Sequence, residues 1–391
     1  MKRCIGLVAT ITLLASSGCM HDETEVLRKA EAVVALAIDT KVIDTRADGD
    51  RVIEDSSFPA GYSLGVHLAE PDGASDYEPV EGALQLRSHG VRFTSDDKGS
   101  WNAYSEKERG EPFYLTKRNA GVYAWYPYLD AEGKEIKIPS GQYGPQATIP
   151  VALLEKGAID ELKQDAAVNA AVAERDYMWA ALPGDSRFVN SGKGSEVLTE
   201  GNKTGNPGPA IHLPMKHALA LVSFRFYNDG RFFGPGGVTG FSLRNSLENE
   251  FGTHPAGVLL TAGTNPVMNI STGNITTGEF KPVVLGRTLK EGIYTMPKAS
   301  ETMSVEAAIA ASPWVSLLVF PVDALTANAL AVDITIDGEV FTLPLAHGST
   351  TAWQPGVNHR YTVKASGRQV SVASVAATPW NEQAPVVVPV Q

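Results

Sequence analysis

Residues 217–228, HALALVSFRFYN, decide the fold class of this chain. In an extended strand, alternate side chains point to opposite faces. One face here carries four apolar side chains and the other begins with two: Ala220, Val222, Phe224 and Phe226 on the first, Leu219 and Leu221 on the second. A strand that is apolar on both faces at one end has to be covered there from both sides. The stretch therefore predicts a strand buried in a layered β fold.

The rest of the chain repeats this strand character in short apolar runs separated by turn residues. Leu64, Val66 and Leu68 alternate in one such run. Asp337-Gly338 stands between two other alternating runs, which is a strong signal for a two-residue β-hairpin. Residues 158–174 are rich in alanine with helical spacing, and predict one short helical insertion. We therefore expect a mainly all-β chain that forms sandwiches, with one helical insertion.

Length and composition predict two domains. The chain has 391 residues, enough for two separate cores. Residues 189–210 are rich in Gly, Asn, Ser and Thr, which favours an interdomain loop. We place an N-terminal sandwich at 47–207 and a C-terminal sandwich with a tail strand at 208–391. The formal charge of −11 argues against nucleic acid or an anionic lipid surface as a partner.

The beginning of the sequence has the pattern of an export signal. A basic start precedes an apolar run over residues 5–15 that is too short to span a bilayer. Small residues then lead to Cys19, so residues 1–18 fit either an ordinary secretory signal or a lipoprotein signal. In the second case Cys19 would carry the lipid, such as palmitate. The other cysteine, Cys4, lies in the leader, so we expect no intramolecular disulfide in the mature chain.

Residues 32–47, AVVALAIDTKVIDTRA, form an apolar stretch that ends at a basic residue. Four apolar side chains would lie on one side of an extended chain: Val34, Leu36, Ile38 and Val42. The β-branched residues favour a strand, and a helix through residues 23–38 is the alternative. Arg46 closes the stretch before a turn-rich segment that we expect to be exposed. At this point it is open whether the strand is permanent or removable.

The sequence contains none of the catalytic motifs that we searched for: HExxH, GxSxG, a Walker A loop, or GxGxxG after a strand. His212 and His217 would point to opposite faces of a strand, which does not suit a metal pair, and His217 is expected to be structural. Aromatic residues at 101–104 and 125–128 could stack on a sugar, although packing in a core is the simpler role. We therefore predict no enzyme, no catalytic or metal site and no cofactor.

Six stretches occur in a fixed order: GYSLGVHLAE at 61–70, YAWYPY at 123–128, RDYMWA at 175–180, LPMKHALALVSFRF at 213–226, WQPGVNHRYTV at 353–363 and ATPW at 377–380. Together they resemble the fimbrillin-like (FimA/Mfa-type) pilin family of the Bacteroides group over roughly residues 45–380. The acidic run CMHDETE resembles the export tag of surface lipoproteins in that group. The resemblance implies two tandem transthyretin-like Greek-key β-sandwiches and an outer-membrane lipoprotein precursor. It also implies a structural role in a fimbrium that serves cell adhesion.

The resemblance also implies a mode of assembly. In polymerising members, an extracellular Arg-specific protease removes the lipid tether together with the first strand. A strand from another pilin subunit then fills the groove. Matched onto this sequence, Cys19 takes the lipid position and Arg46-Ala47 the processing position, so residues 19–46 are the tether and removable strand. Arg51 is the second candidate for cleavage, whereas cleavage at Arg28 would leave the strand in place.

The C-terminal tail is the candidate donor strand. Three valines alternate in APVVVPVQ: Val386, Val388 and Val390. Pro385 and Pro389 each remove a backbone donor, so a frayed tail is the alternative. A tail that cannot donate would make the chain a tip or accessory subunit. A second function also stays open, that of a non-polymerising surface lipoprotein that binds glycans, host proteins or bacterial surface ligands.

Overall fold

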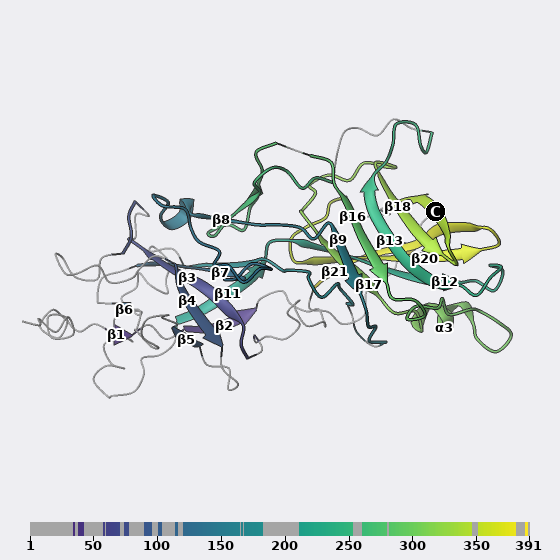
Figure 1. The fold of residues 1–391 in the computed structure, drawn as a ribbon, viewed down its shortest axis with the longest axis horizontal. Coiled ribbons are helices and arrows are strands. Elements are labelled where there is room, and N and C mark those ends of the chain that lie inside the picture. The colour runs from purple at the N-terminus through teal and green to yellow at the C-terminus, as the bar shows by residue number, and fades with distance from the viewer. Residues whose placement is uncertain are drawn as a thin grey trace, which may run out of the picture.

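The computed structural model describes a large part of the chain, mostly in strands. The described residues are 34–35, 38–42, 58, 60–70, 74–77, 90–95, 101–103, 114–115, 120–164, 166, 168–182, 211–252, 260–279, 281–345, 351–380 and 388–389. Within them, the helical elements are α3 (Val305–Ala310) and the short 3-10 helix η1 (Gly144–Gln146). The prediction of a mainly all-β sandwich fold is confirmed. Figure 1 shows the first half of the chain at the left of an elongated molecule and the second half at the right.

The first half, together with β11 from the second, builds a seven-stranded sheet in the order β2-β11-β10-β7-β3-β4-β5. These strands are β2 (Ile38–Val42), β11 (Ile211–His217), β10 (Met178–Leu182), β7 (Gly121–Tyr126), β3 (Ser63–Ala69), β4 (Val91–Ser95) and β5 (Trp101–Ala103). One core cluster lies against this sheet, and Leu64, Val66 and Leu68 belong to it as the alternation predicts. Two further strands, β1 (Val34–Ala35) and β6 (Tyr114–Leu115), form a separate antiparallel ladder.

The second half forms two five-stranded sheets, one of which is completed by β9 from the first half. The first has the order β17 (Val315–Val319), β12 (Ala220–Asn228), β20 (Val357–Ser366), β21 (Gln369–Pro379), β22 (Val388–Pro389). The second has the order β19 (Glu339–Pro344), β18 (Leu330–Ile336), β13 (Val238–Asn245), β16 (Val284–Leu289), β9 (Lys156–Ile159). Residues of both sheets share one core, which includes Phe224 and Phe226 of β12 and Phe241 of β13. The predicted inner face of β12 is therefore confirmed.

A third core cluster joins the two halves. It contains Trp125 and Ile149 from the first half together with Leu219, Leu221 and Leu318 from the second. Leu219 and Leu221 are the other apolar face that the sequence predicts at the start of β12. Strands cross the division as well, because β8 (Thr148–Pro150) pairs with β14 (Val267–Asn269), beside β15 (Ile275–Thr276). The predicted boundary near residue 207 lies outside the described residues and stays a prediction.

The predicted helix over residues 158–174 is wrong for the described residues of that range. The segment begins in β9, which runs parallel to β16, and continues without a helix. Asn169 fixes this path, since its Oδ1 accepts from Lys163 N at 2.8 Å and its Nδ2 donates to Trp314 O at 2.7 Å. A Cβ added at Gly157 would lie 2.6 Å from Ala171 Cβ. Alanine is frequent here because the chain packs closely, not because it is helical.

A buried ion pair anchors the end of the same segment. Glu174 accepts hydrogen bonds from Arg287 Nε at 3.0 Å and from Arg287 Nη2 at 2.6 and 2.8 Å. It also accepts one from Leu318 N at 2.9 Å. Both charged side chains are almost fully buried. Because Arg287 lies on β16 and Leu318 on β17, this single carboxylate joins the first half to both sheets of the second.

The hairpin predicted at Asp337-Gly338 is confirmed. Ile336 pairs with Glu339 across a two-residue turn between β18 and β19. Asp337 and Gly338 have φ angles of 52° and 84°, which is the left-handed geometry that Asp-Gly adopts readily. The Asp337 carboxylate also accepts hydrogen bonds from Gly236 N and Gly237 N at 2.9 and 2.8 Å. The turn therefore holds the neighbouring loop as well as its own strands.

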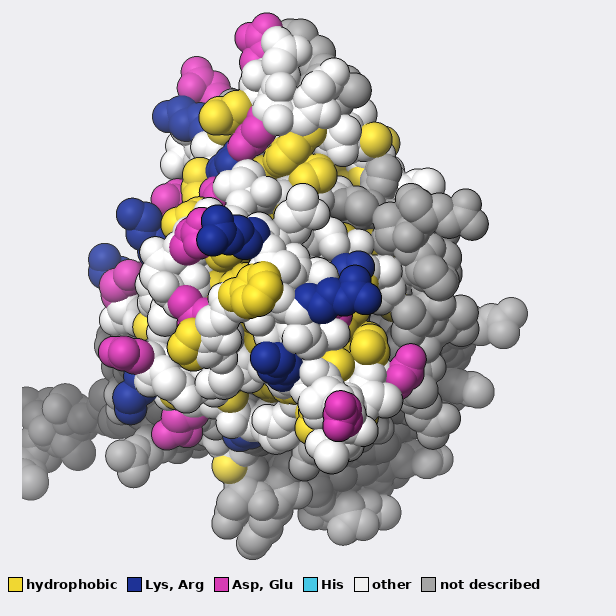
Figure 2. Space-filling view, turned by 90° about the vertical axis from the view of Figure 1, so that its right-hand side faces the viewer, with side chains coloured by type: hydrophobic (Ala, Val, Ile, Leu, Met, Phe, Trp, Pro, Cys, Tyr) yellow, Lys and Arg dark blue, Asp and Glu magenta, His cyan; other side chains and the backbone are white. Residues whose placement is uncertain are grey.

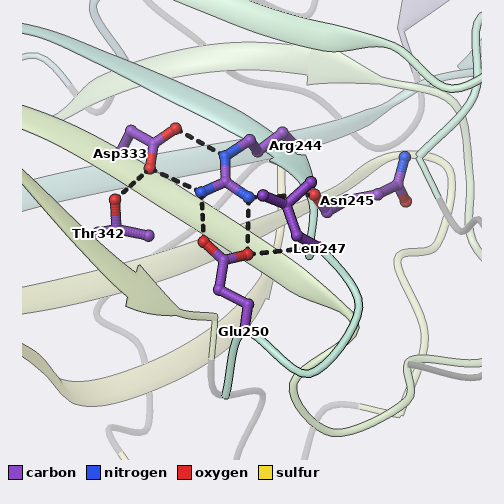
Figure 3. A network of polar contacts seen from close by, with 6 residues as sticks. All are labelled: Arg244, Asn245, Leu247, Glu250, Asp333 and Thr342. Atoms are coloured by element: carbon purple, nitrogen blue, oxygen red, sulfur yellow. Dashed lines mark hydrogen bonds and ion pairs between the residues drawn. The ribbon is translucent and has the colours of Figure 1, made fainter. Parts of the chain in front are cut away.

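A polar network around one arginine joins three strands and a turn of the second half (Figure 3). Arg244 of β13 donates to both Asp333 oxygens at 2.7 and 3.1 Å, and to both Glu250 oxygens at 2.9 and 2.7 Å. Asp333 of β18 also accepts from Thr342 Oγ1 of β19 at 2.6 Å. The hydrogen bonds from Arg244 lower the pKa of the Glu250 carboxyl below its usual value. This network holds the turn that contains Glu250 against the sheet that contains β13 and β18.

The far end of the second half mixes apolar and charged side chains (Figure 2). Exposed hydrophobic residues of this half include Phe233 and Val340, whose surfaces are 79% and 61% accessible to solvent. In Figure 2, side chains of both charge signs surround the hydrophobic ones. Single exposed apolar residues among charges are ordinary for a solvated surface.

Candidate functional site

The candidate site is the edge of the seven-stranded sheet that β2 closes. β2 is the outermost strand there and runs parallel to β11, with Ile38 opposite Ile211 and Val42 opposite Met215. Ile38 is buried and packs in the same core cluster as Leu213 and Met215. A short N-terminal strand therefore supplies both an edge ladder and part of a core.

β11 depends on β2 for much of its pairing. On its other side the described ladder to β10 holds only Met178 opposite His217 and Trp179 opposite Lys216. Residues 211–215 are paired, within the described part of the chain, with β2 alone. Pro214 lies in this stretch, and proline is confined to strands near a sheet edge because it cannot donate to the ladder. Among the described strands, loss of β2 would leave this part of β11 without a partner.

The core below this edge is strongly apolar. Leu213 and Met215 are fully buried and lie in one cluster with Met178 and Val66. Ile38 covers part of this cluster. Burying one such side chain contributes about 1.5–3 kcal/mol, so removal of β2 would expose apolar side chains of this cluster at an energetic cost.

The structure places some of the predicted site residues and divides the expected first strand. Val34 lies in β1 opposite Leu115 of β6, whereas Ile38 and Val42 lie in β2. The stretch thus contributes to two ladders, and its described part is strand and not helix. Five predicted residues lie outside the described part of the chain: Cys19, Leu36, Arg46, Ala47 and Val386. So does Val390, and these assignments remain predictions.

The tail forms a ladder with its own sheet. β22 pairs antiparallel with β21, with Val388 opposite Val375 and Pro389 opposite Ser374. This places the described tail residues at the outer edge of the sheet that also contains β12 and β20. The position shows that Val388-Pro389 can add to a sheet edge despite the proline.

Trp380, which directly precedes the C-terminal tail, packs against the end of β11. His217, expected to be a structural residue at a strand start, instead ends β11, with Nδ1 at 2.6 Å from Asp176 Oδ2. Both side chains are fully buried. The Trp380 ring lies against His217, with 3.8 Å between ring centroids, and Trp380 N donates to Gly356 O. His217 at the end of β11 therefore contacts both Asp176 and Trp380, the residue that precedes the C-terminal tail.

Sequence reasoning missed Asp176, Glu174 and Arg287. Asp176 lies within the quoted motif RDYMWA and Glu174 directly precedes it, but neither spacing nor composition shows that they are buried. The expected packing role of the aromatic residues is confirmed, since Trp101 and Trp125 are buried. In the described residues, no cluster of three His, Cys, Asp or Glu side chains could hold a metal ion. The described helices include none that is long and apolar enough to cross a membrane.

The fold and the paired edge define the class, which is an all-β sandwich protein with an N-terminal strand at one sheet edge. A family model described as fimbrillin-like matches residues 45–380. The chain belongs to the fimbrillin-like family, as the sequence motifs predict. The family associates the chain with fimbrial adhesion, with other pilin subunits and with the cell surface.

One solved structure with a TM-score above 0.5 shows the same fold, and the chain also resembles two others. A candidate cell adhesion protein from Bacteroides ovatus is similar with 13% identity and a TM-score of 0.54, over 90% of this chain and 100% of that chain. A second candidate cell adhesion protein, from Bacteroides uniformis, has 15% identity and a TM-score of 0.48, over 88% and 98% of the two chains. A fimbrial protein from Bacteroides vulgatus has 12% identity and a TM-score of 0.41, over 88% and 99%. A comparison with curated proteins gave no match.

Proposed function

We propose that this chain is a structural or accessory subunit of a fimbria that assembles by strand exchange. Export as a lipoprotein would place Cys19 at the outer membrane. A protease that cuts after Arg46 would then remove the tether and β2, and a strand from another subunit would enter beside β11. The subunit has no catalytic role in this scheme.

The observation that carries the proposal is the position of β2. It is a sheet edge, it precedes Arg46 by only four residues, and it pairs with a strand stretch that has no other described partner. Arg46 follows the last residue of β2, so cleavage there would separate the strand from the sandwich. Cleavage at Arg51 would do the same, whereas cleavage at Arg28 would not.

The donor strand in this proposal is the tail around Val388. Alternating valines suit a groove lined by apolar side chains. The pairing of Val388 with Val375 supports the capacity of the tail to form a ladder. A tail that stays on its own sheet would instead make the chain a terminal subunit.

N-terminal sequencing of protein from the cell surface tests the proposal. We expect Ala47 as the first residue and oligomer ladders that resist SDS. Arg46→Ala should accumulate as the lipidated precursor and lose the ladders, while Arg51→Ala, the matched control, should process normally. Recovery of only the lipidated full-length monomer would contradict the proposal and favour the non-polymerising surface lipoprotein.

A further inference from the structure

A cavity of about 550 Å³ opens in the first half of the chain, away from the β2 edge. Its lining comes from the start of β3, from β4, from the turn after β7 and from the residue preceding Asp176. The volume lies within the range of small-ligand sites. None of these residues takes part in the proposed strand exchange.

Two arginines line the cavity, in a protein whose formal charge is −11. Arg92 is held by its Nε hydrogen bond to Ser63 Oγ at 3.0 Å, and its guanidinium lies 5.9 Å from the Tyr128 ring centroid. Arg175 is half-buried, and in the described part of the chain its one hydrogen bond goes to the Glu174 carbonyl at 3.2 Å. Guanidinium groups in a concave site favour a planar carboxylate, which accepts two parallel hydrogen bonds.

The same cavity offers an aromatic wall. The rings of Tyr62 and Tyr126 are stacked, with 5.8 Å between centroids and 21° between planes. Tyr126 is buried, whereas Tyr62 is half-buried and reaches the surface. An aromatic surface of this kind packs against the apolar C–H face of a sugar ring, because such a ring combines a C–H face with polar hydroxyl groups.

An acceptor completes the site. Asp130 Oδ1 accepts from Glu132 N and Lys134 N at 3.0 and 2.8 Å. No hydrogen bond is found to Asp130 Oδ2 within the described residues, so this oxygen can accept from a ligand hydroxyl. A carboxylate that lines the same cavity as the arginines disfavours a multiply charged anion such as phosphate or sulfate. It suits a ligand that has one carboxylate and several hydroxyl groups.

We propose that this cavity binds a saccharide that carries a carboxylate, of the uronic-acid type. Arg175 and Arg92 hold the carboxylate, Tyr62 packs on the sugar ring, and Asp130 accepts from a hydroxyl. The inference extends the adhesive side of the proposed function, but it requires neither cleavage nor polymerisation. Ligand binding by the monomer is therefore measured separately from the SDS-resistant ladders.

Calorimetric titration of the full chain with digalacturonate tests this inference, with neutral galactobiose and triglutamate as the competing probes. We expect binding of digalacturonate and at least about tenfold weaker binding of galactobiose, as loss of a charge-assisted hydrogen bond requires. Arg175→Ala should weaken digalacturonate binding by about tenfold or more, and Arg175→Lys by less, since lysine keeps the charge but not the fork. Arg368→Ala is the control, because Arg368 is exposed on the β20–β21 turn.

Three results would overturn the inference. They are the absence of digalacturonate binding, equal binding of galactobiose, and unchanged binding by Arg175→Ala with its folded spectrum intact. A fourth result, triglutamate binding as tight as digalacturonate binding, would overturn the saccharide class and indicate an acidic peptide instead. Loss of the ladders in the separate assembly assay leaves all these outcomes unaffected.

Discussion

The buried pair of Glu174 and Arg287 is where a single side chain has the largest expected effect. Glu174→Ala would leave a buried guanidinium without its carboxylate, which typically costs about 3–5 kcal/mol of unfolding free energy. Denaturant titration of the variant measures this loss. The double variant Glu174→Met with Arg287→Met should recover most of it, because no charge is then buried alone. A single variant as stable as the wild type would contradict the role of the pair.

His359 gives the chain a dependence on pH. Burial lowers the pKa of His359 to about 4, and its Nε2 accepts a hydrogen bond from Gln354 N at 3.2 Å. The unfolded chain binds a proton on this residue below about pH 6.5, while the folded chain does not. The contribution of His359 to the free energy of unfolding is therefore fully present above about pH 6.5. It falls by up to about 1.4 kcal/mol per pH unit as the pH drops toward 4.

The variant His359→Gln isolates that contribution. Glutamine offers an acceptor to Gln354 N but does not titrate. The difference in unfolding free energy between wild type and variant, measured from pH 7 to about pH 4.5, should change with the slope given above. A constant difference across this range would show that His359 does not control it.

At the scale of elements, β2 is the part whose attachment to the sheet is most easily tested. Ile38→Asp places a carboxylate in an apolar core, and should cost about 2–4 kcal/mol of local stability. Hydrogen exchange of the β11 amides over residues 211–217 should then become faster in the precursor. Val172→Asp is the matched control, since Val172 is exposed and its variant should leave β11 protected. Unchanged exchange in Ile38→Asp would mean that β2 does not hold the edge.

Elements with a strict local pattern could be predicted from the sequence. The faces of β12 follow from alternation, and the turn at Asp337-Gly338 follows from its two residue types. The segment over 158–174 could not be predicted, because small residues suit both a helix and a tightly packed crossing segment. Long-range contacts decide between them, as with Asn169, which bonds Trp314 far along the chain. The contact between Asp176 and His217 could not be predicted for the same reason, because the two residues lie far apart in the sequence.

At the scale of the whole molecule, the shared core predicts that the two halves unfold together. Leu221 and Trp125 lie in one cluster although they belong to different halves, and β9 completes a sheet of the second half. Far-UV circular dichroism and tryptophan fluorescence should therefore give one coincident transition in denaturant. Leu221→Ala should shift both signals equally and cost about 2–5 kcal/mol. Two separated transitions would show that the halves are independent.

The direction of β2 has an energetic consequence. Parallel ladders have slanted hydrogen bonds and are slightly less stable per residue than antiparallel ones. β2 runs parallel to β11, and its hydrogen-bond ladder is therefore slightly weaker than that of an antiparallel strand at the same edge. In the strand exchange that we propose, an incoming strand that runs antiparallel would gain slightly more per residue from its ladder than the resident strand does. The direction of the resident strand would therefore favour its replacement once the proposed cleavage after Arg46 has freed it.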